Sequence, residues 1–95
     1  MPAYLIADTR VTDQVAYDEY RRQVGPQIAR FGGRFLIRGG AHQVLEGTWQ
    51  PGRVVVIEFP TMAALRAWYD SPEYAPLIAL RQRAAEGNLI AVEGT

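Results

Sequence analysis

The side chains best suited to chemistry in this 95-residue chain are a carboxylate, a guanidinium group and the only imidazole. Asp8 lies in a run of β-forming residues, Arg38 ends another such run, and His42 follows it closely. An arginine holds a carboxylate at two points, and a histidine exchanges protons near neutral pH. Arg38 is therefore a candidate anchor for a small organic acid, with Gly39 and Gly40 leaving room beside the backbone. Asp8 and His42 are the candidate catalytic residues.

A structural role explains most of the same residues, and the pattern favours it. Asp8 and Arg38 would pair across a dimer interface, since buried charges usually exist in pairs. His42 would then be an exposed or dimer-contact residue. Tyr17 lies at helical spacing and is a core residue by pattern, but its hydroxyl is a candidate ligand contact in a pocket between helix and sheet. Arg53 is expected on the opposite face of the sheet from Arg38.

The elements that must position these residues follow from alternation and helical periodicity. Strands are predicted over residues 3–11, 34–38, 53–59 and 88–93, and helices over residues 13–31 and 62–70 with a continuation to residue 87. Gly25-Pro26 should kink the first helix, because proline lacks a backbone donor. Ser71-Pro72 should restart the second, since serine caps helices and proline suits the first helical position. Residues 42–46 should form an extended arm.

The order strand, helix, strand, strand, helix, strand predicts an α+β fold of the ferredoxin-like βαββαβ type. Two right-handed crossovers give an antiparallel sheet of order four-one-three-two with helices on one face only. The other face would still carry apolar side chains, which water tolerates poorly as a patch. They are Ile6, Leu36, Val54, Val56, Ile90 and Val92. Two such faces packed together would make a homodimer.

Composition excludes several classes of function. Ten basic and ten acidic side chains balance, which disfavours nucleic-acid binding and electrostatic attachment to membranes. No cysteine is present, so thiolate metal sites and a cysteine nucleophile are excluded. The sequence has no phosphate-binding or dinucleotide-binding glycine motif, and neither a cofactor nor a metal is expected. No apolar segment approaches a membrane span and the start resembles no signal peptide, so a cytoplasmic location is expected.

Several short stretches together resemble a bacterial family of unknown function, DUF-1330. They are Arg38-Gly39-Gly40, Glu46-Gly47, residues 53–59 (RVVVIEF), Trp68-Tyr69-x-Ser71-Pro72-x-Tyr74 and Glu93-Gly94. The resemblance covers essentially the whole chain as a single domain, residues 1–95. It implies the dimeric α/β-barrel (ferredoxin-like) superfamily and a homodimer. Members of that superfamily include cofactor-independent monooxygenases, isomerases and lyases, and proteins without a known reaction, so the resemblance implies no single activity.

Two functions remain open at this point. One is a cofactor-independent small-molecule enzyme or binder, with its pocket between sheet and helices or inside the dimer. The other is a non-catalytic dimeric accessory or interaction module. A polar cluster that opens into a cavity would favour the first, and a cluster closed entirely by ion pairs would favour the second.

Overall fold

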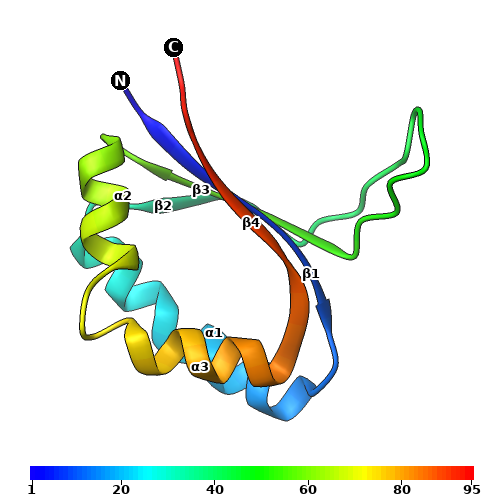
Figure 1. Cartoon of the computed structure of the whole chain (residues 1–95), viewed down its shortest axis with the longest axis horizontal. Coiled ribbons are helices and arrows are strands. Elements are labelled where there is room, and N and C mark those ends of the chain that lie inside the picture. Colours follow the sequence, from blue (N-terminus) through cyan, green and yellow to red (C-terminus); the bar gives the residue numbers. More distant parts are fainter.

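The computed structural model describes residues 1–95 and contains four strands and three helices (Figure 1). The strands form one antiparallel sheet in the order β2-β3-β1-β4, which confirms the predicted order and fold class. All three helices lie on one side of this sheet. The elements in chain order are β1 (Ala3–Val11), α1 (Gln14–Arg30), β2 (Arg34–Arg38), β3 (Arg53–Phe59), α2 (Met62–Tyr69), α3 (Ala75–Ala84) and β4 (Ala85–Glu93).

Strand β1 occupies the middle of the sheet and sorts its side chains by alternation. It pairs with β3 on one side and with β4 on the other. Leu5, Ala7 and Thr9 are buried beneath the helices, whereas Ile6 and Asp8 on the opposite face are only half-buried. The facing predicted for this strand is therefore correct, and the sheet has a helix-free face.

Helix α1 forms where the sequence predicts it, capped by Asp13, whose Oδ1 accepts a hydrogen bond from the Ala16 amide at 3.2 Å. Its buried stripe faces the sheet at three- and four-residue steps. The helix continues through Pro26, where the kink is predicted, to Arg30. The stripe consists of Tyr17, Tyr20, Val24 and Ile28.

The second helical region is divided differently from the prediction. Ser71 does not restart a helix: its hydroxyl donates to the Trp68 carbonyl at 2.8 Å and accepts from the Tyr74 amide at 3.2 Å. This turn separates α2 from α3, which begins only at Ala75. Strand β4 then follows α3 without a connecting loop and starts at Ala85, three residues before the predicted start.

The core centres on large aromatic side chains between α2, α3 and the sheet. Phe59, Trp68 and Tyr74 are fully buried. The Phe59 and Trp68 rings stack with centroids 5.5 Å apart, and the Trp68 and Tyr74 centroids are 4.2 Å apart. Burying these large rings makes a large hydrophobic contribution to the stability of a small domain. None of the three helices has the length and apolarity needed to cross a membrane.

Residues 39–52, hereafter the arm, leave the sheet as a long excursion without helix or strand (Figure 1). Leu45 and Trp49 in the arm are 86% and 63% exposed. The Trp49 indole Nε1 donates to Asp8 Oδ2 at 2.8 Å, and the Gly52 amide donates to Asp8 Oδ1 at 2.8 Å. Asp8 therefore fixes the base of the arm to the helix-free face of the sheet.

Candidate functional site

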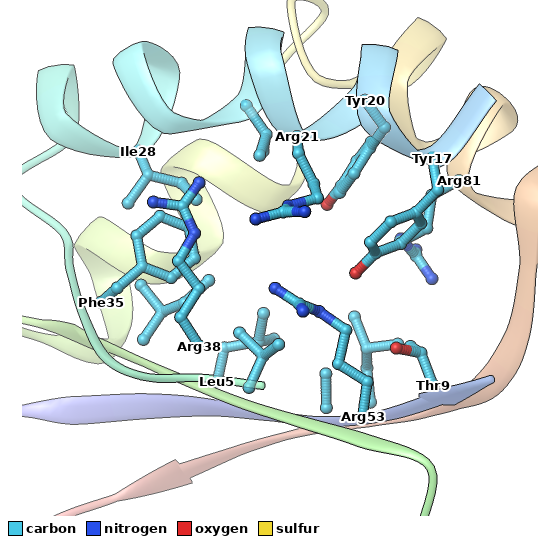
Figure 2. A pocket seen from close by; sticks show the side chains of 15 residues that line it. Leu5, Thr9, Tyr17, Tyr20, Arg21, Ile28, Phe35, Arg38, Arg53 and Arg81 are labelled. Carbon is cyan, nitrogen blue, oxygen red and sulfur yellow. The ribbon is translucent and has the colours of Figure 1, made fainter. Parts of the chain in front are cut away.

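A cavity lies between the sheet and helices α1 and α3 (Figure 2). It measures about 470 Å³ including its open mouth, with about 40 Å³ of room for water-sized molecules inside. Ten of its fifteen lining residues are hydrophobic, drawn mainly from the buried faces of the sheet and α1. The hydrophobic residues include Leu5, Val24, Ile28, Phe35, Val55 and Ile57.

The charged residues of the cavity are all arginines: Arg21, Arg38, Arg53 and Arg81. No aspartate or glutamate lines it. Among the ion pairs of the chain, only one involves these four side chains, a contact of 3.8 Å between Arg21 Nη1 and Asp18 Oδ1. In Figure 2 the guanidinium groups of Arg21, Arg38 and Arg53 extend into the cavity from α1, β2 and β3. The site is therefore cationic, and Arg38, Arg53 and Arg81 have no counterion in the chain.

Arg38 lies on the helix-covered side of the sheet, so its predicted position on the helix-free face is wrong. The cause is a β-bulge: between Phe35 and Ile37, β2 advances by two residues while β3 advances by one. Arg38 consequently pairs with Val55, whose side chain is buried under the helices. A one-residue shift reverses the facing of every side chain that follows. The Arg38 guanidinium then lies 4.1 Å from the centre of the Phe35 ring.

Arg53 lies on the face that the sequence predicts, and Gly39 is what gives it room. Gly39 has a φ of +76°, and a Cβ atom there would overlap the Arg53 guanidinium. Gly40 is different, since a Cβ atom at that position meets nothing within 4 Å. Arg53 lies over the Tyr17 ring with its Cζ 5.7 Å from the ring centre. Its Nε atom is buried and has no hydrogen-bond partner in the protein.

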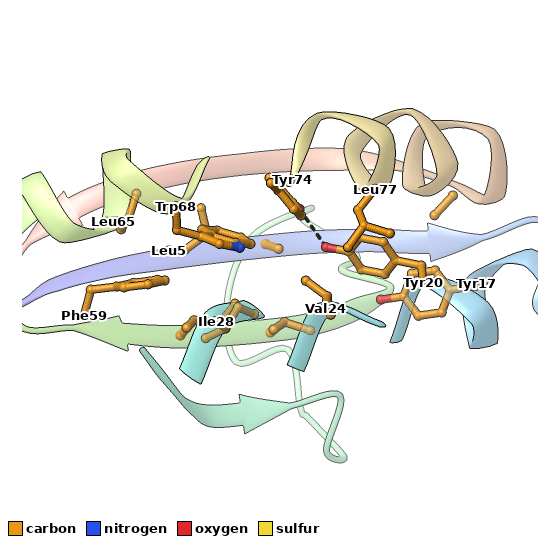
Figure 3. Packing of buried hydrophobic residues seen from close by; sticks show 14 of the residues in the cluster. Leu5, Tyr17, Tyr20, Val24, Ile28, Phe59, Leu65, Trp68, Tyr74 and Leu77 are labelled. Atoms are coloured by element: carbon orange, nitrogen blue, oxygen red, sulfur yellow. Dashed lines mark hydrogen bonds between the residues drawn. The ribbon is translucent and has the colours of Figure 1, made fainter. Parts of the chain in front are cut away.

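A buried part of the cavity wall contains Arg81 and Tyr20, and Tyr20 bonds to Tyr74, which is fully buried and does not line the cavity. The hydroxyls of Tyr20 and Tyr74 are 2.7 Å apart and hydrogen-bonded, and Figure 3 shows this bond beside the Trp68 ring. Burial raises the pKa of Tyr20 far above its usual value, and burial also raises the pKa of Tyr74. Burial alone would lower the pKa of Arg81, but the negative charge that Tyr74 and Tyr20 take on when they ionise outweighs it, so that pKa is raised. The raised pKa values keep both tyrosines neutral and Arg81 charged near neutral pH.

Two polar atoms in this buried part are without partners in the protein. The Thr9 hydroxyl is buried in a residue that is 3% exposed, and the Nε atom of Arg81 is buried in a residue that is 9% exposed. Both residues line the cavity. Buried polar groups are nearly always hydrogen-bonded, so unpartnered ones are informative. Of the five such atoms in the chain, three belong to cavity residues, Thr9, Arg53 and Arg81.

The predicted site residues are only partly brought together. Arg38 and Tyr17 line the cavity, and Gly39 packs against Arg53. Asp8 lies on the opposite face, where it holds the arm, and His42 is exposed on the arm itself. Asp8 and Arg38 lie on opposite faces and form no ion pair within the chain, whereas the predicted pair joined two copies across a dimer interface and stays a prediction. No group of three or more His, Asp or Glu residues is placed to hold a metal ion.

Two cavity residues were not predicted although helical spacing contains a signal for each. Arg21 is four residues after Tyr17 and therefore lies on the same face of α1. Arg81 is four residues after Leu77, and both are buried along α3, whereas the predicted stripe continued through Leu80. Arginine is rarely buried, which is why a pattern of apolar residues passes over it.

The fold recurs in several solved structures. A protein of unknown function from Rhodopseudomonas palustris, RPA0582, is 25% identical with a TM-score of 0.80, and the match covers 99% of this chain and 82% of that one. SnoaB, a cofactor-independent oxygenase from Streptomyces nogalater, is 12% identical with a TM-score of 0.69 over 99% and 93% of the two chains. HapK from Hahella chejuensis is 20% identical with a TM-score of 0.61 over 98% and 92%.

The fold of these solved structures agrees with the α+β fold that the sequence predicts. At 12% and 20% identity, SnoaB and HapK show likeness of fold alone. A search among curated proteins found no match to the chain. A family model does match, over residues 2–95, and its description agrees with the resemblance found in the sequence. The chain therefore belongs to the family defined by the domain of unknown function DUF1330.

Proposed function

We propose that this protein binds a small organic acid in the cavity between the sheet and helices α1 and α3. The observation that supports the proposal is the excess of guanidinium groups, with four arginines and no carboxylate on the cavity wall. Guanidinium groups that share a cavity with no carboxylate on its wall repel each other, and a bound anion offsets that repulsion. Their planar donors suit a carboxylate in particular.

The remaining lining indicates the rest of the ligand. Most of the wall is apolar, so a molecule with a hydrocarbon body gains by leaving water. The enclosed room of about 40 Å³ is small, so the ligand must be small and must extend into the open mouth of the cavity. Bulky polymers and nucleic acids do not fit this description. The proposal is therefore a small amphipathic acid.

The same arrangement would serve either binding or catalysis. Arginines in a largely apolar cavity stabilise negative charge that develops on an oxygen during a reaction. SnoaB is a cofactor-independent oxygenase with this fold, which makes a cofactor-independent reaction a reasonable hypothesis. A non-catalytic module is the alternative, and a polar cluster closed by ion pairs would have favoured it. The arginine cluster opens into a cavity instead, which supports the ligand-binding function.

The test is calorimetric titration and thermal shift with a panel of small organic acids. The variants are Arg38→Lys and, as a matched control, Arg83→Lys, since Arg83 is exposed on α3 and absent from the cavity wall. Arg38→Lys keeps the charge but loses the two-point contact, so affinity should fall about tenfold. Arg83→Lys should bind like the wild type. The proposal is wrong if no acid binds the wild type, or if both variants bind equally well.

We also propose that the protein is a homodimer through the helix-free face. Ile37, Ile90 and Val92 on that face are 46%, 58% and 42% exposed, which is unusual for neighbouring apolar residues on a sheet. Val56 lies among them, paired with Ile6 of β1 and Ile37 of β2. A second copy would cover this face while leaving the cavity on the helix side.

Light scattering on Val56→Asp tests the dimer, with Val15→Asp as the control because Val15 on α1 is 83% exposed. A carboxylate buried without a partner costs several kcal/mol, so Val56→Asp should be monomeric. Val15→Asp should remain a dimer. A wild-type protein that is monomeric at micromolar concentration would refute the proposal.

A further inference from the structure

Polar groups occupy both ends of the cavity rather than one. In Figure 2, Arg38 and Phe35 lie at one end, Tyr17, Thr9 and Arg81 lie at the other, and Arg53 lies between them. The two ends also differ in depth. Arg38 is exposed, so its end opens to solvent, whereas Thr9 and Arg81 are 3% and 9% exposed.

The strand register separates the two ends along the sheet. Thr9 is the direct neighbour of Arg53, and Arg38 is the direct neighbour of Val55. The partners of Arg38 and Thr9 are thus two residues apart on β3, so the two backbone positions are offset by about 7 Å along the strand. Figure 2 also draws the Arg38 guanidinium at the opposite end of the cavity from Thr9 and Arg81. A ligand held only by Arg38 would leave the inner polar groups without partners.

The inner end is itself built to hold an oxygen. The Thr9 hydroxyl and the Arg81 Nε are both buried, unpartnered in the protein and part of the cavity wall. Arg81 carries a charge that no carboxylate of the chain neutralises. An apolar tail placed there would leave a buried cation facing hydrocarbon, which is costly. An anionic oxygen placed there satisfies both groups.

We infer that the ligand is a dicarboxylate, with one carboxylate at Arg38 and Arg53 and the second at Thr9 and Arg81. Its hydrocarbon segment lies against the apolar wall between the two ends. The inference rests on the proposed function, since it names the class of acid that the same cavity takes.

The experiment compares acids that match in chain length but differ in the second carboxylate. The probes are succinate with butyrate, glutarate with valerate, and adipate with hexanoate, titrated by calorimetry into the full chain. In at least one of these three pairs, the diacid should bind at least about tenfold more tightly than the monoacid. A hydrogen bond to a charged group contributes a binding free energy of that size.

Thr9→Val is the decisive variant, because it removes the inner hydroxyl and preserves the shape of the side chain. It should lose most of the preference for the diacid and keep the affinity for the monoacid. Its fold should survive, since it removes a buried hydroxyl without a partner. Arg81→Lys should act in the same direction, and Arg38→Lys should weaken both kinds of acid.

The outcomes separate the two proposals. If a monoacid binds as tightly as its matched diacid and Arg38→Lys weakens both, the inference is wrong and the proposed function stands. A diacid preference that is unchanged in Thr9→Val also overturns the inference. If neither kind of acid binds the wild type, the proposed function fails as well.

Discussion

Replacing Tyr74 by phenylalanine tests whether the buried tyrosine pair stabilises the fold. The change removes one hydroxyl of a 2.7 Å hydrogen bond and leaves the other, on Tyr20, buried in a residue that is 8% exposed. A buried polar group without a partner costs about 1–3 kcal/mol. For a domain of this size, a loss of about 2 kcal/mol lowers Tm by roughly 10 °C.

Tyr20→Phe should cost a similar amount, because it leaves the Tyr74 hydroxyl, in a residue that is fully buried, without its Tyr20 partner. In a chain that already has Tyr74→Phe, the same change removes an orphaned hydroxyl and should be neutral or stabilising. The two effects are therefore non-additive, as expected for groups in contact. Tyr69→Phe is the control, since the Tyr69 hydroxyl makes no hydrogen bond.

The assay is urea unfolding followed by circular dichroism at one fixed protein concentration, since association would shift the transition. All four chains of the cycle and the Tyr69 control are measured together. If Tyr20→Phe costs the same with and without Tyr74→Phe, the two hydroxyls do not interact energetically. That result would refute the stabilising role of the hydrogen bond between Tyr20 and Tyr74.

Two further predictions concern the arginine site and the sheet surface. Gly39→Ala should destabilise the fold by about 1–2 kcal/mol, because its φ is +76° and its methyl group would displace Arg53, whereas Gly40→Ala should have little effect on Tm. Gly39→Ala should also weaken acid binding in calorimetry, and an unchanged affinity would contradict the placement of Arg53. A hydrogen bond from Arg34 lowers the pKa of Glu58 from its ordinary value of 4.5, so its stabilisation is present above that pH and is lost as pH falls through the folded value. Urea unfolding at about pH 5 and pH 3 should show a smaller loss of stability in Arg34→Gln than in the wild type.

The fold was predictable because its signals are local and repeated. Alternation along β1 and the stripe from Tyr17 to Ile28 each involve several residues that agree. The connection rules then leave few sheet orders to consider. The same reasoning identified Arg38 and Tyr17 as candidate ligand contacts and located a pocket between helix and sheet.

The composition of the site was less predictable, for two physical reasons. The bulge in β2 is a change in the backbone that turns Arg38 to the other face of the sheet. No residue type in β2 predicts it. Arg81 is buried because tyrosine hydroxyls and the cavity surround it, and these neighbours come from distant parts of the chain. Asp8 was assigned to chemistry because it is a carboxylate on a strand, but its partners, Trp49 and Gly52, lie more than forty residues away.

The placement of the two tryptophans makes the protein a source of two separate optical signals. Trp68 is fully buried against Phe59, so its emission reports the integrity of the core. Trp49 is 63% exposed on the arm, so a soluble quencher such as acrylamide reaches it first. A single-tryptophan chain, made by Trp68→Phe or Trp49→Phe, would isolate each signal. Fluorescence can therefore follow events at the arm and unfolding of the core independently, without an attached dye.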